Sequence, residues 1–331
     1  MKKQKFKLVK QSLIDLGLLK NRKLAVIGYG SQGRAQALNL RDSGLTPVIG
    51  LQTKSKSRPQ ARRDGFTVIT PAKAVQNAEI IVVLVPDHKH KELFERDLQG
   101  AIYPGRTFIF AHALSVHFGL VRQPENIDFL LVAPHGPGIR VREKYLAGEG
   151  VTAFIGRTDK SSKGCLKLAA SYAVAMGCDK AGMIETSFHD EAVGDIFGEQ
   201  AVLCGGLAGL LKSGFDTLVH AGLPPENAYL ECVYQLDLIV DLIKKYGIGG
   251  MYDRISVTAA LGSMKAESKI INRQSRKAMK AMLKNIESGK FANDLIVEYK
   301  SGFKNLIKAQ NKNHKMLFDD IAKFFAAKFA D

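Results

Sequence analysis

The chain has 331 residues, which is enough for two domains that each bury a core of their own. Its composition, 46% hydrophobic and 24% charged, is typical of a soluble globular protein. The net charge of +16 raises the question of nucleic-acid binding. Because the cations are spread along the chain without a zinc-finger or RNP-like pattern, we expect no nucleic-acid partner. A basic surface that attracts phosphate or carboxylate ligands is favoured, with nucleic acid as the minor alternative.

The cysteines and the apolar runs indicate where the protein works. The four cysteines lie far apart without a C-x-x-C pair, which predicts reduced, buried thiols in a cytoplasmic protein. No apolar segment of a secretory signal follows the basic start of the chain. The longest apolar runs, such as residues 80–85, have the length of a strand, so we expect no membrane span. The cysteines are Cys165, Cys178, Cys204 and Cys232.

In the first half of the chain, short β-rich runs alternate with helical patterns. This alternation predicts a Rossmann-type α/β domain, a doubly wound parallel sheet with helices on both faces. The predicted strands are residues 24–27, 47–49, 66–69, 80–85, 107–110, 129–132 and 152–155. The predicted helices are residues 33–43, 71–77 and 160–176.

Near residue 187 the strands end and patterns with the 3.6-residue period of a helix take over. Glycines and prolines separate them. The sequence therefore predicts an α/β domain of residues 1–186 and an all-helical domain of residues 187–331. The predicted helices of the second domain are residues 195–212, 225–246, 263–288 and 302–329.

A glycine motif follows the first predicted strand and opens the first helix. It reads Gly28-Tyr29-Gly30-Ser31-Gln32-Gly33. Its glycines allow a tight turn and a close approach of the backbone, and the free N–H groups of a helix N-terminus attract a pyrophosphate. Because a second strand follows about twenty residues later, the motif predicts a dinucleotide cofactor.

The end of the second strand predicts which dinucleotide binds. An NAD enzyme usually carries an acid there to hold the ribose 2′-hydroxyl group. Residues 50–58 contain no acid and place Ser55 and Ser57 among cations, which favours the 2′-phosphate of NADPH. The alternative for this segment is a solvated basic turn.

Two helical segments of the second half carry pairs of side-chain oxygen donors four residues apart. Asp195 and Glu199 lie in an almost uncharged helix that we expect to be buried on most of its circumference. Two carboxylates on one buried face repel each other, and a cation such as Mg²⁺ relieves that penalty. Glu231 and Gln235 repeat the spacing, so the two helices can present three carboxylates and an amide to shared Mg²⁺ ions. The alternative for each pair is a solvated polar strip.

Three other side chains are candidates for the site. His112 and His135 stand at the C-terminal ends of neighbouring strands, where open α/β sheets bind ligands. A structural hydrogen bond explains one such histidine as well as catalysis does, but two together favour function. Ser256 follows a glycine-rich turn, where it either binds a substrate carboxylate or caps a helix.

Several segments together resemble the short-form ketol-acid reductoisomerases. The most specific are residues 25–44 around the glycine motif, Ala111-His112, residues 132–138 and Phe197–Gly206, within a likeness that covers about residues 12–262. The resemblance implies an enzyme of isoleucine and valine biosynthesis that depends on NADPH and Mg²⁺. Its small-molecule substrates are 2-acetolactate and 2-aceto-2-hydroxybutyrate, both 2-hydroxy-3-keto acids. An alkyl shift precedes reduction by NADPH to a 2,3-dihydroxy acid.

The resemblance also implies roles for single residues. Asp195 resembles the ligand that bridges two ions, Glu199 a ligand of one ion and Glu231 a ligand of the other. Gln235 stands in the remaining ligand position, Ser256 resembles the substrate-carboxylate contact, and His112 and His135 are the implied catalytic residues. The family's helical domain is knotted and dimerises, which implies a homodimer or a higher homo-oligomer. The implied cofactor contacts are Gly28, Tyr29, Gly30, Ser31, Gln32, Gly33, Gln52, Ser55, Ser57, Asp87 and Gly138.

This chain departs from the family pattern within the site. The family has lysine at the position of His135, glutamate at that of Gln235 and, in many members, arginine at that of Gln52. These changes remove charges from the neighbourhood of the metals and the cofactor. Three hypotheses follow: a working ketol-acid reductoisomerase, a diverged NADPH-dependent 2-ketoacid reductase, or a catalytically impaired NADP-binding paralogue.

Overall fold

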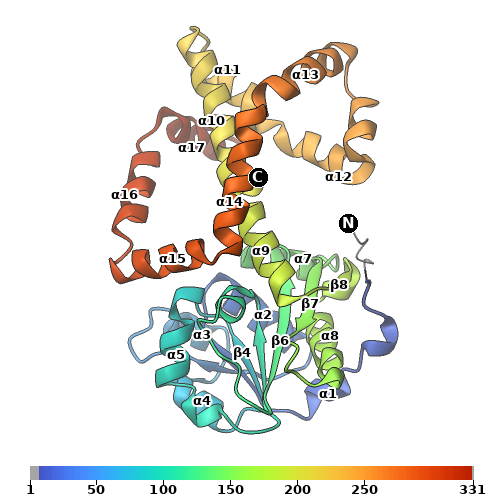
Figure 1. The fold of residues 1–331 in the computed structure, drawn as a ribbon, viewed down its shortest axis with the longest axis vertical. Coiled ribbons are helices and arrows are strands. Elements are labelled where there is room, and N and C mark those ends of the chain that lie inside the picture. The colour runs from blue at the N-terminus through green and yellow to red at the C-terminus, as the bar shows by residue number, and fades with distance from the viewer. Residues whose placement is uncertain (1–6, 330–331) are drawn as a thin grey trace. The chain divides into compact units, whose positions relative to one another are not determined.

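The structure, a computed structural model, describes residues 7–329 and divides into two compact units (Figure 1). The first unit ends at Gly194 and the second begins at Asp195. The predicted domain boundary after residue 186 lies just before helix α9 (Phe188–Gly198), and the two units meet within that helix.

An eight-stranded sheet forms the centre of the first unit, in the order β3-β2-β1-β4-β5-β6-β7-β8. The order turns back at β1, which pairs in parallel with both β2 and β4, and this confirms the predicted doubly wound α/β fold. Every predicted strand is present, and the sequence does not predict β8. The strands are β1 (Leu24–Ile27), β2 (Val48–Gly50), β3 (Val68–Ile69), β4 (Ile80–Val83), β5 (Thr107–Phe110), β6 (Asp128–Pro134), β7 (Ala153–Arg157) and β8 (Met183–Glu185).

One pair of neighbouring strands departs from the parallel pairing of the rest of the sheet. β6 and β7 are antiparallel, so that Pro134 at the end of β6 faces Ala153 at the start of β7. Helix α7 (Gly138–Leu146) lies between these strands in the sequence, but the chain comes back to the edge from which it left instead of crossing over. His135 donates its backbone N–H to the carbonyl of Thr152, 2.8 Å away, and so closes this return.

Helices cover both faces of the sheet, as predicted (Figure 1). Residues of α2 and α8 pack on one face around the fully buried Leu40 and Tyr172. Residues of α4 and α5 pack on the other face, where the rings of Phe94, Phe108 and Phe129 contact one another in tilted and edge-on arrangements. The helices of this unit are α1 (Gly17–Lys20), α2 (Ser31–Asp42), α3 (Arg58–Arg63), α4 (Pro71–Gln76), α5 (His90–Arg96), α6 (Leu114–His117), α7 and α8 (Leu166–Ala175).

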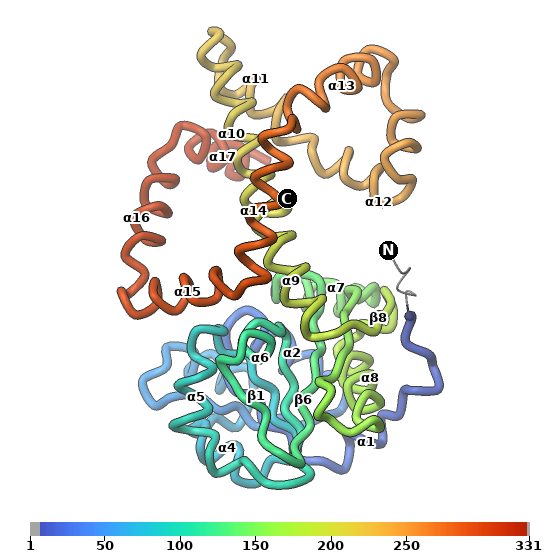
Figure 2. Tube along the Cα trace, in the orientation of Figure 1, coloured from blue at the N-terminus to red at the C-terminus, as the bar shows by residue number. Residues whose placement is uncertain are grey.

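The second unit is helical throughout the residues that the structure describes, as predicted. Figure 2 shows α12 and α13 on one side of α10 and α14, and α15 to α17 on the other. The predicted helix at residues 263–288 is broken at Ile271 and Asn272, and α15 is not predicted. The elements are η6 (Glu199–Leu203), α10 (Gly205–His220), α11 (Pro225–Tyr229), η7 (Leu230–Tyr234), α12 (Leu236–Tyr252), α13 (Val257–Ile270), α14 (Arg273–Glu287), α15 (Lys290–Lys300), α16 (Lys304–Asn313) and α17 (Leu317–Lys328); η6 and η7 are π-helical.

The second unit buries little apolar surface of its own. One cluster consists of Phe215, Ala228, Ile321 and Phe325 with a few partly buried neighbours. The prediction that the helix around Asp195 and Glu199 is mostly buried is wrong for a single chain, because both residues are exposed. Exposed large apolar side chains in this unit include Val202, Leu203, Leu210, Tyr234, Leu238 and Ile248.

Two further findings bear on the expected environment of the protein. Phe188–His220 forms a 33-residue helical run with a mean hydropathy of 1.3 over 18 residues, long and apolar enough to cross a membrane by length and composition alone. The sequence does not reveal this run, because polar residues and glycines interrupt its apolar stretches. Cys165 and Cys178 are buried as expected, but Cys232 is partly exposed and Cys204 exposed.

Candidate cofactor and metal site

The glycine motif forms the turn that the sequence predicts. Gly28 has a φ of +110°, and a Cβ atom there would lie 2.6 Å from the carbonyl oxygen of Leu84. A Cβ at Gly33 would lie 2.4 Å from the oxygen of Gly28, so the start of α2 sits directly on the loop. A Cβ at Gly30 would meet nothing within 4 Å. Gly30 therefore borders open space at the N-terminus of α2, where a pyrophosphate can approach the backbone.

The start of α7 packs against the same loop. Gln32 donates its side-chain amide to the carbonyl of Gly136, at 2.8 Å. A Cβ at Gly138 would lie 2.2 Å from the backbone oxygen of Ser31, so only glycine fits at this contact. Two helix N-termini thus meet beside the predicted cofactor position, and their N–H groups add to the attraction for phosphate.

The side chain of Tyr29 is turned away from the cofactor position into the core. Its hydroxyl donates to Asp64 at 2.8 Å, and Arg34 donates to the same carboxylate at 2.7 Å. The hydrogen bond from Arg34 is the main cause that lowers the pKa of Asp64 to about 2, against the opposing effect of burial. The Tyr29 hydroxyl is therefore engaged within the protein.

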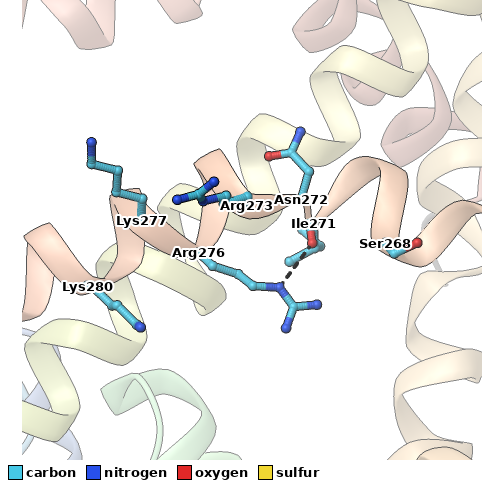
Figure 3. A pocket seen from close by; sticks show the side chains of 7 residues that line it. All are labelled: Ser268, Ile271, Asn272, Arg273, Arg276, Lys277 and Lys280. Atoms are coloured by element: carbon cyan, nitrogen blue, oxygen red, sulfur yellow. Dashed lines mark hydrogen bonds between the residues drawn. The ribbon is translucent and has the colours of Figure 1, made fainter.

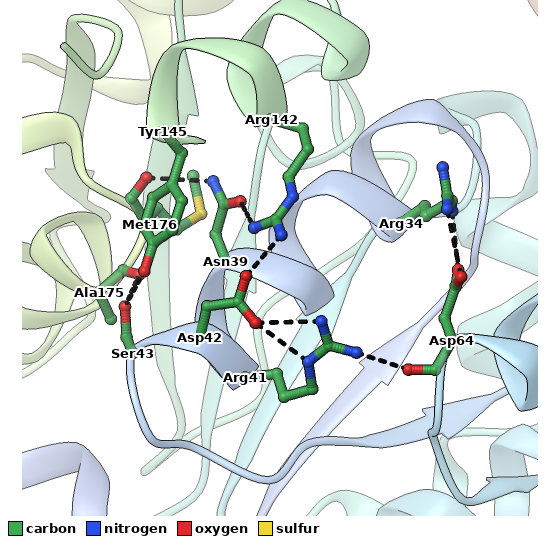
Figure 4. Close-up of polar contacts among 10 residues, drawn as sticks. All are labelled: Arg34, Asn39, Arg41, Asp42, Ser43, Asp64, Arg142, Tyr145, Ala175 and Met176. Carbon is green, nitrogen blue, oxygen red and sulfur yellow. Dashed lines mark hydrogen bonds and ion pairs between the residues drawn. The ribbon is translucent and has the colours of Figure 1, made fainter. Parts of the chain in front are cut away.

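A second polar cluster fastens α2 to α7 and α8 (Figure 4). Arg142 on α7 donates to Asn39 at 2.8 Å and also pairs with Asp42, both on α2. Asn39 donates in turn to the carbonyl of Met176, and Ser43 donates to that of Ala175. These bonds hold α2 rigidly, and with it the orientation of its N-terminus.

The segment after β2 differs from the expected row of free cations and hydroxyls. Ser55 and Ser57 are partly exposed, and the Ser55 hydroxyl accepts the backbone N–H of Ser57 at 3.3 Å. The guanidinium of Arg58 points inward and donates to three backbone carbonyls. Gln52 donates its amide to the carboxylate of Asp97 at 2.6 Å. The carbonyls that Arg58 contacts are those of Leu51, Val68 and Ile69.

Asp87, a predicted cofactor contact, lies against His112, which is partly buried. Its carboxylate is 3.0 Å from Nδ1 of that histidine. Burial acts to raise the pKa of Asp87, but the hydrogen bond and charge of His112 and the charge of His90 outweigh it and lower the pKa. The pair therefore fixes the orientation of the His112 ring at the end of β5.

Two buried groups that the sequence does not single out support this strand end. His90 bridges the Ser115 hydroxyl, at 2.6 Å, and the Val85 carbonyl, at 2.8 Å, and burial lowers its pKa. Glu191 is 3% exposed and accepts the backbone N–H of Ala113 at 2.8 Å. Neither contact has a local sequence signal, because the partners lie 25 and 78 residues apart.

The other predicted catalytic histidine occupies an exposed position at the end of β6. The Nδ1 atom of His135 is 3.0 Å from the Thr152 hydroxyl. The imidazole ring packs in a T-shaped arrangement against the ring of Phe154, with 4.3 Å between the ring centroids. The structure thus gives His135 the structural hydrogen bond that is the alternative to catalysis, while leaving the ring open to solvent.

The acidic pair of the second unit borders a widened helical turn. Asp195 lies in α9, Glu199 is the first residue of the π-helical η6, and the N–H of Cys204 bonds to the carbonyl of Glu199 five residues earlier. A Cβ at Gly205 would lie 2.3 Å from the carbonyl oxygen of Gln200, so this turn requires glycine there. π-helical turns often occur at functional sites. Two exposed carboxylates one turn apart suit a hard cation such as Mg²⁺.

The second pair has the same local form. Glu231 lies in the π-helical η7, and Gln235 follows it directly. The Gln235 amide donates to the Glu231 carboxylate at 3.2 Å, which leaves the amide oxygen available as a ligand. Within residues 7–329, however, no three His, Cys, Asp or Glu side chains gather as a metal site. The three predicted carboxylate ligands, Asp195, Glu199 and Glu231, therefore do not form one group within these residues.

Ser256 is the N-cap of α13, and its hydroxyl accepts the N–H of Ala259 at 3.1 Å. At the far end of α13, about 20 Å away by helical rise, lies a pocket of about 540 Å³ (Figure 3). Arg273, Arg276, Lys277 and Lys280 line it. The pocket is strongly basic, but it contains none of the predicted site residues.

Comparison with known proteins gives a consistent family. Residues 18–182 match the family profile described as "Acetohydroxy acid isomeroreductase, NADPH-binding domain", and residues 188–323 match "Ketol-acid reductoisomerase, C-terminal domain". A ketol-acid reductoisomerase (NADP(+)) from Petrotoga mobilis is 44% identical over 309 residues, 93% of this chain and 94% of that protein. One from Campylobacter concisus is 44% identical over 289 residues, 87% and 85% of the two chains.

A solved structure shows the same architecture. An NADH-preferring ketol-acid reductoisomerase from an uncultured archean superposes with a TM-score of 0.93 at 36% sequence identity, over 98% of this chain and all of that one.

Proposed function

Because the chain belongs to the ketol-acid reductoisomerase family, we propose that it is a working enzyme of isoleucine and valine biosynthesis. It converts 2-acetolactate and 2-aceto-2-hydroxybutyrate to 2,3-dihydroxy acids with NADPH and Mg²⁺. The observation that carries this proposal is the exposed pair of carboxylates at Asp195 and Glu199, next to a π-helical turn in a chain that matches a family member over 93% of its length. The relatives are biosynthetic enzymes, and we place this one in the cytoplasm, where its thiols stay reduced.

The residues of the first unit bind and orient. The backbone at Gly30 and the N-terminus of α2 hold the cofactor pyrophosphate. His112, held by Asp87 at 3.0 Å, exchanges a proton with a substrate oxygen at the end of β5. When bound, Mg²⁺ polarises the substrate oxygens and NADPH supplies the hydride. Asp195 and Glu199 supply the carboxylate oxygens that hold the metal.

A second copy of the chain completes the site. The residues that the structure describes hold no three-ligand group within one chain, which supports a metal site whose remaining ligands, Glu231 and Gln235, come from the other copy. Apolar side chains left exposed in the second unit support the same arrangement, since a monomer rarely leaves such large patches uncovered. The carboxylates of Asp195 and Glu199 within the apolar run Phe188–His220 favour coverage by protein rather than lipid. Ser256, in the same unit, contacts the substrate carboxylate.

The departures from the family pattern lower the rate without removing a step. Gln235 keeps an oxygen donor but not the charge, so Mg²⁺ binds more weakly. His135 lacks the permanent charge of lysine. We therefore expect a higher Mg²⁺ requirement than in a protein with glutamate at position 235.

An assay with 2-acetolactate, NADPH and Mg²⁺ tests the proposal. The expected result is oxidation of NADPH with formation of the dihydroxy acid, abolished by a chelator and raised by the double substitution Gln235→Glu with His135→Lys. Reduction of a 3-hydroxy-2-ketoacid without turnover of 2-acetolactate would contradict it and identify a simple reductase. NADPH binding without any turnover would identify an impaired paralogue.

A further inference from the structure

The end of β2 holds an acid that the local sequence does not contain. Residues 50–58 carry no Asp or Glu, yet Gln52 donates its amide to Asp97 at 2.6 Å. Asp97 is the C-cap of α5, 45 residues further along the chain. A carboxylate therefore contacts the side chain of Gln52, which follows the end of β2. Dinucleotide-binding folds distinguish a 2′-hydroxyl from a 2′-phosphate at this strand end.

The charges around this position favour the 2′-phosphate less than the sequence indicates. The guanidinium of Arg58 donates to the backbone carbonyls of Leu51, Val68 and Ile69 and does not face outward. Only Lys54 and Lys56, both exposed, remain as flexible cations within residues 50–57. Exposed lysines are strongly hydrated, and salt screens their attraction for phosphate.

The charge of Asp97 is only partly balanced. Arg96 donates to it from two nitrogens, at 2.8 and 3.2 Å, but the third nitrogen of the same guanidinium donates to Glu92 at 2.7 Å. Two acids thus share one arginine, and this end of α5 keeps a net negative charge. The Asp97 side chain is 13% exposed, so water screens its charge less than that of a surface acid.

We propose that Asp97, acting with Gln52, determines the cofactor specificity of this protein and reduces its preference for NADPH until NADH also serves. The carboxylate repels a 2′-phosphate and accepts a hydrogen bond from a 2′-hydroxyl, directly or through the Gln52 amide. This inference rests on the proposed function only in assigning the dinucleotide site. It requires no turnover.

Direct binding to the full-length protein tests the proposal. NADPH and NADH are titrated separately, with calorimetry and nicotinamide fluorescence as readouts, and the ratio of their dissociation constants is compared between variants. The wild-type protein is expected to bind NADPH less than about tenfold more tightly than NADH. Asp97→Asn, which keeps the shape and an oxygen for Gln52, is expected to raise the preference for NADPH about tenfold. Gln52→Arg is expected to shift it in the same direction.

The matched control is Glu95→Gln, which removes one negative charge from an exposed position of the same helix, where Glu95 pairs with Lys91 at 3.9 Å. Its ratio should stay within twofold of the wild type. The proposal is overturned if Asp97→Asn leaves the ratio unchanged, if Glu95→Gln moves it equally, or if the wild type binds NADPH a hundredfold more tightly. A changed ratio in a protein that does not turn over 2-acetolactate would support this inference and sink the proposed function alone.

Discussion

The two units of the chain differ in how much of their function they contain. The first unit buries apolar side chains on both faces of its sheet and builds the glycine loop, the His112–Asp87 pair and the Asp97 contact from its own residues. The second unit has a small core, exposed apolar helices and two separate ligand pairs. The predicted cofactor contacts therefore lie mostly within one folded unit, whereas the proposed metal site needs a second copy of the chain.

The largest expected effect comes from Asp195→Asn. Loss of the carboxylate that resembles the bridging ligand should lower kcat by about 10³-fold, or about 4 kcal/mol. The dissociation constant of NADPH should stay within twofold, because the first unit is untouched. Steady-state kinetics and calorimetry with NADPH measure the two quantities. Equal losses in kcat and in the affinity for NADPH would show that cofactor binding also depends on Asp195 in the second unit.

Leu238→Glu tests the dependence of the second unit on another copy. Leu238 is 63% exposed in α12, just beyond Gln235, and a carboxylate there would be buried unpaired in the proposed interface. Light scattering should show a shift from dimer to monomer, with turnover lost and NADPH binding retained. The control is Leu146→Glu, on the exposed side of the first unit at 66% exposure. A stable dimer of the Leu238 variant would remove α12 from the interface.

Two alanine substitutions in the glycine motif separate folding from cofactor binding. Gly33→Ala places a Cβ 2.4 Å from the Gly28 oxygen and should lower the free energy of unfolding by about 1–3 kcal/mol. Gly30→Ala meets no protein atom within 4 Å and has a φ of −83° that alanine accepts, so stability should hold. Its added methyl group should instead weaken NADPH binding about tenfold. Urea unfolding and fluorescence titration distinguish the two results. If Gly30→Ala lowered stability and left NADPH binding unchanged, the pyrophosphate would not bind at Gly30.

The smallest effect concerns the ion pair that anchors α3 to α2. The folded pKa of Asp64, about 2, lies below its ordinary value of 3.8, so its contribution to stability is present above pH 4 and is lost as the pH falls towards 2. Asp64→Asn should therefore cost about 1–2 kcal/mol at pH 7 and progressively less below pH 4. Denaturant unfolding at several pH values checks this. Asp159→Asn, at an exposed turn, should show no such pH dependence.

The sequence predicts those features that a short segment determines. The glycine motif needs only its own residues and the strand before it, and the acids at Asp195 and Glu199 share a helix face by spacing alone. Asp97 and Glu191 escape prediction because each contacts a residue far along the chain. The exposed state of the Asp195 helix is also missed, because hydrophobic composition indicates burial without saying which chain covers it. The antiparallel return of β7 depends on a connection whose length fits a crossover equally well.

Because η6 is π-helical, the direction in which α10 faces relative to Asp195 depends on the exact number of residues in η6. Each residue advances an α-helix by about 100°. Deleting one residue from η6 would restore regular hydrogen bonding and rotate α10 by about that angle relative to Asp195. The carboxylates would then no longer share their present alignment with the apolar side of α10. The extra residue of the π-helical turn, and the glycines that allow this wide turn, therefore set how the two carboxylates are oriented relative to the apolar side of α10. Insertions and deletions in η6 should be tolerated less than substitutions.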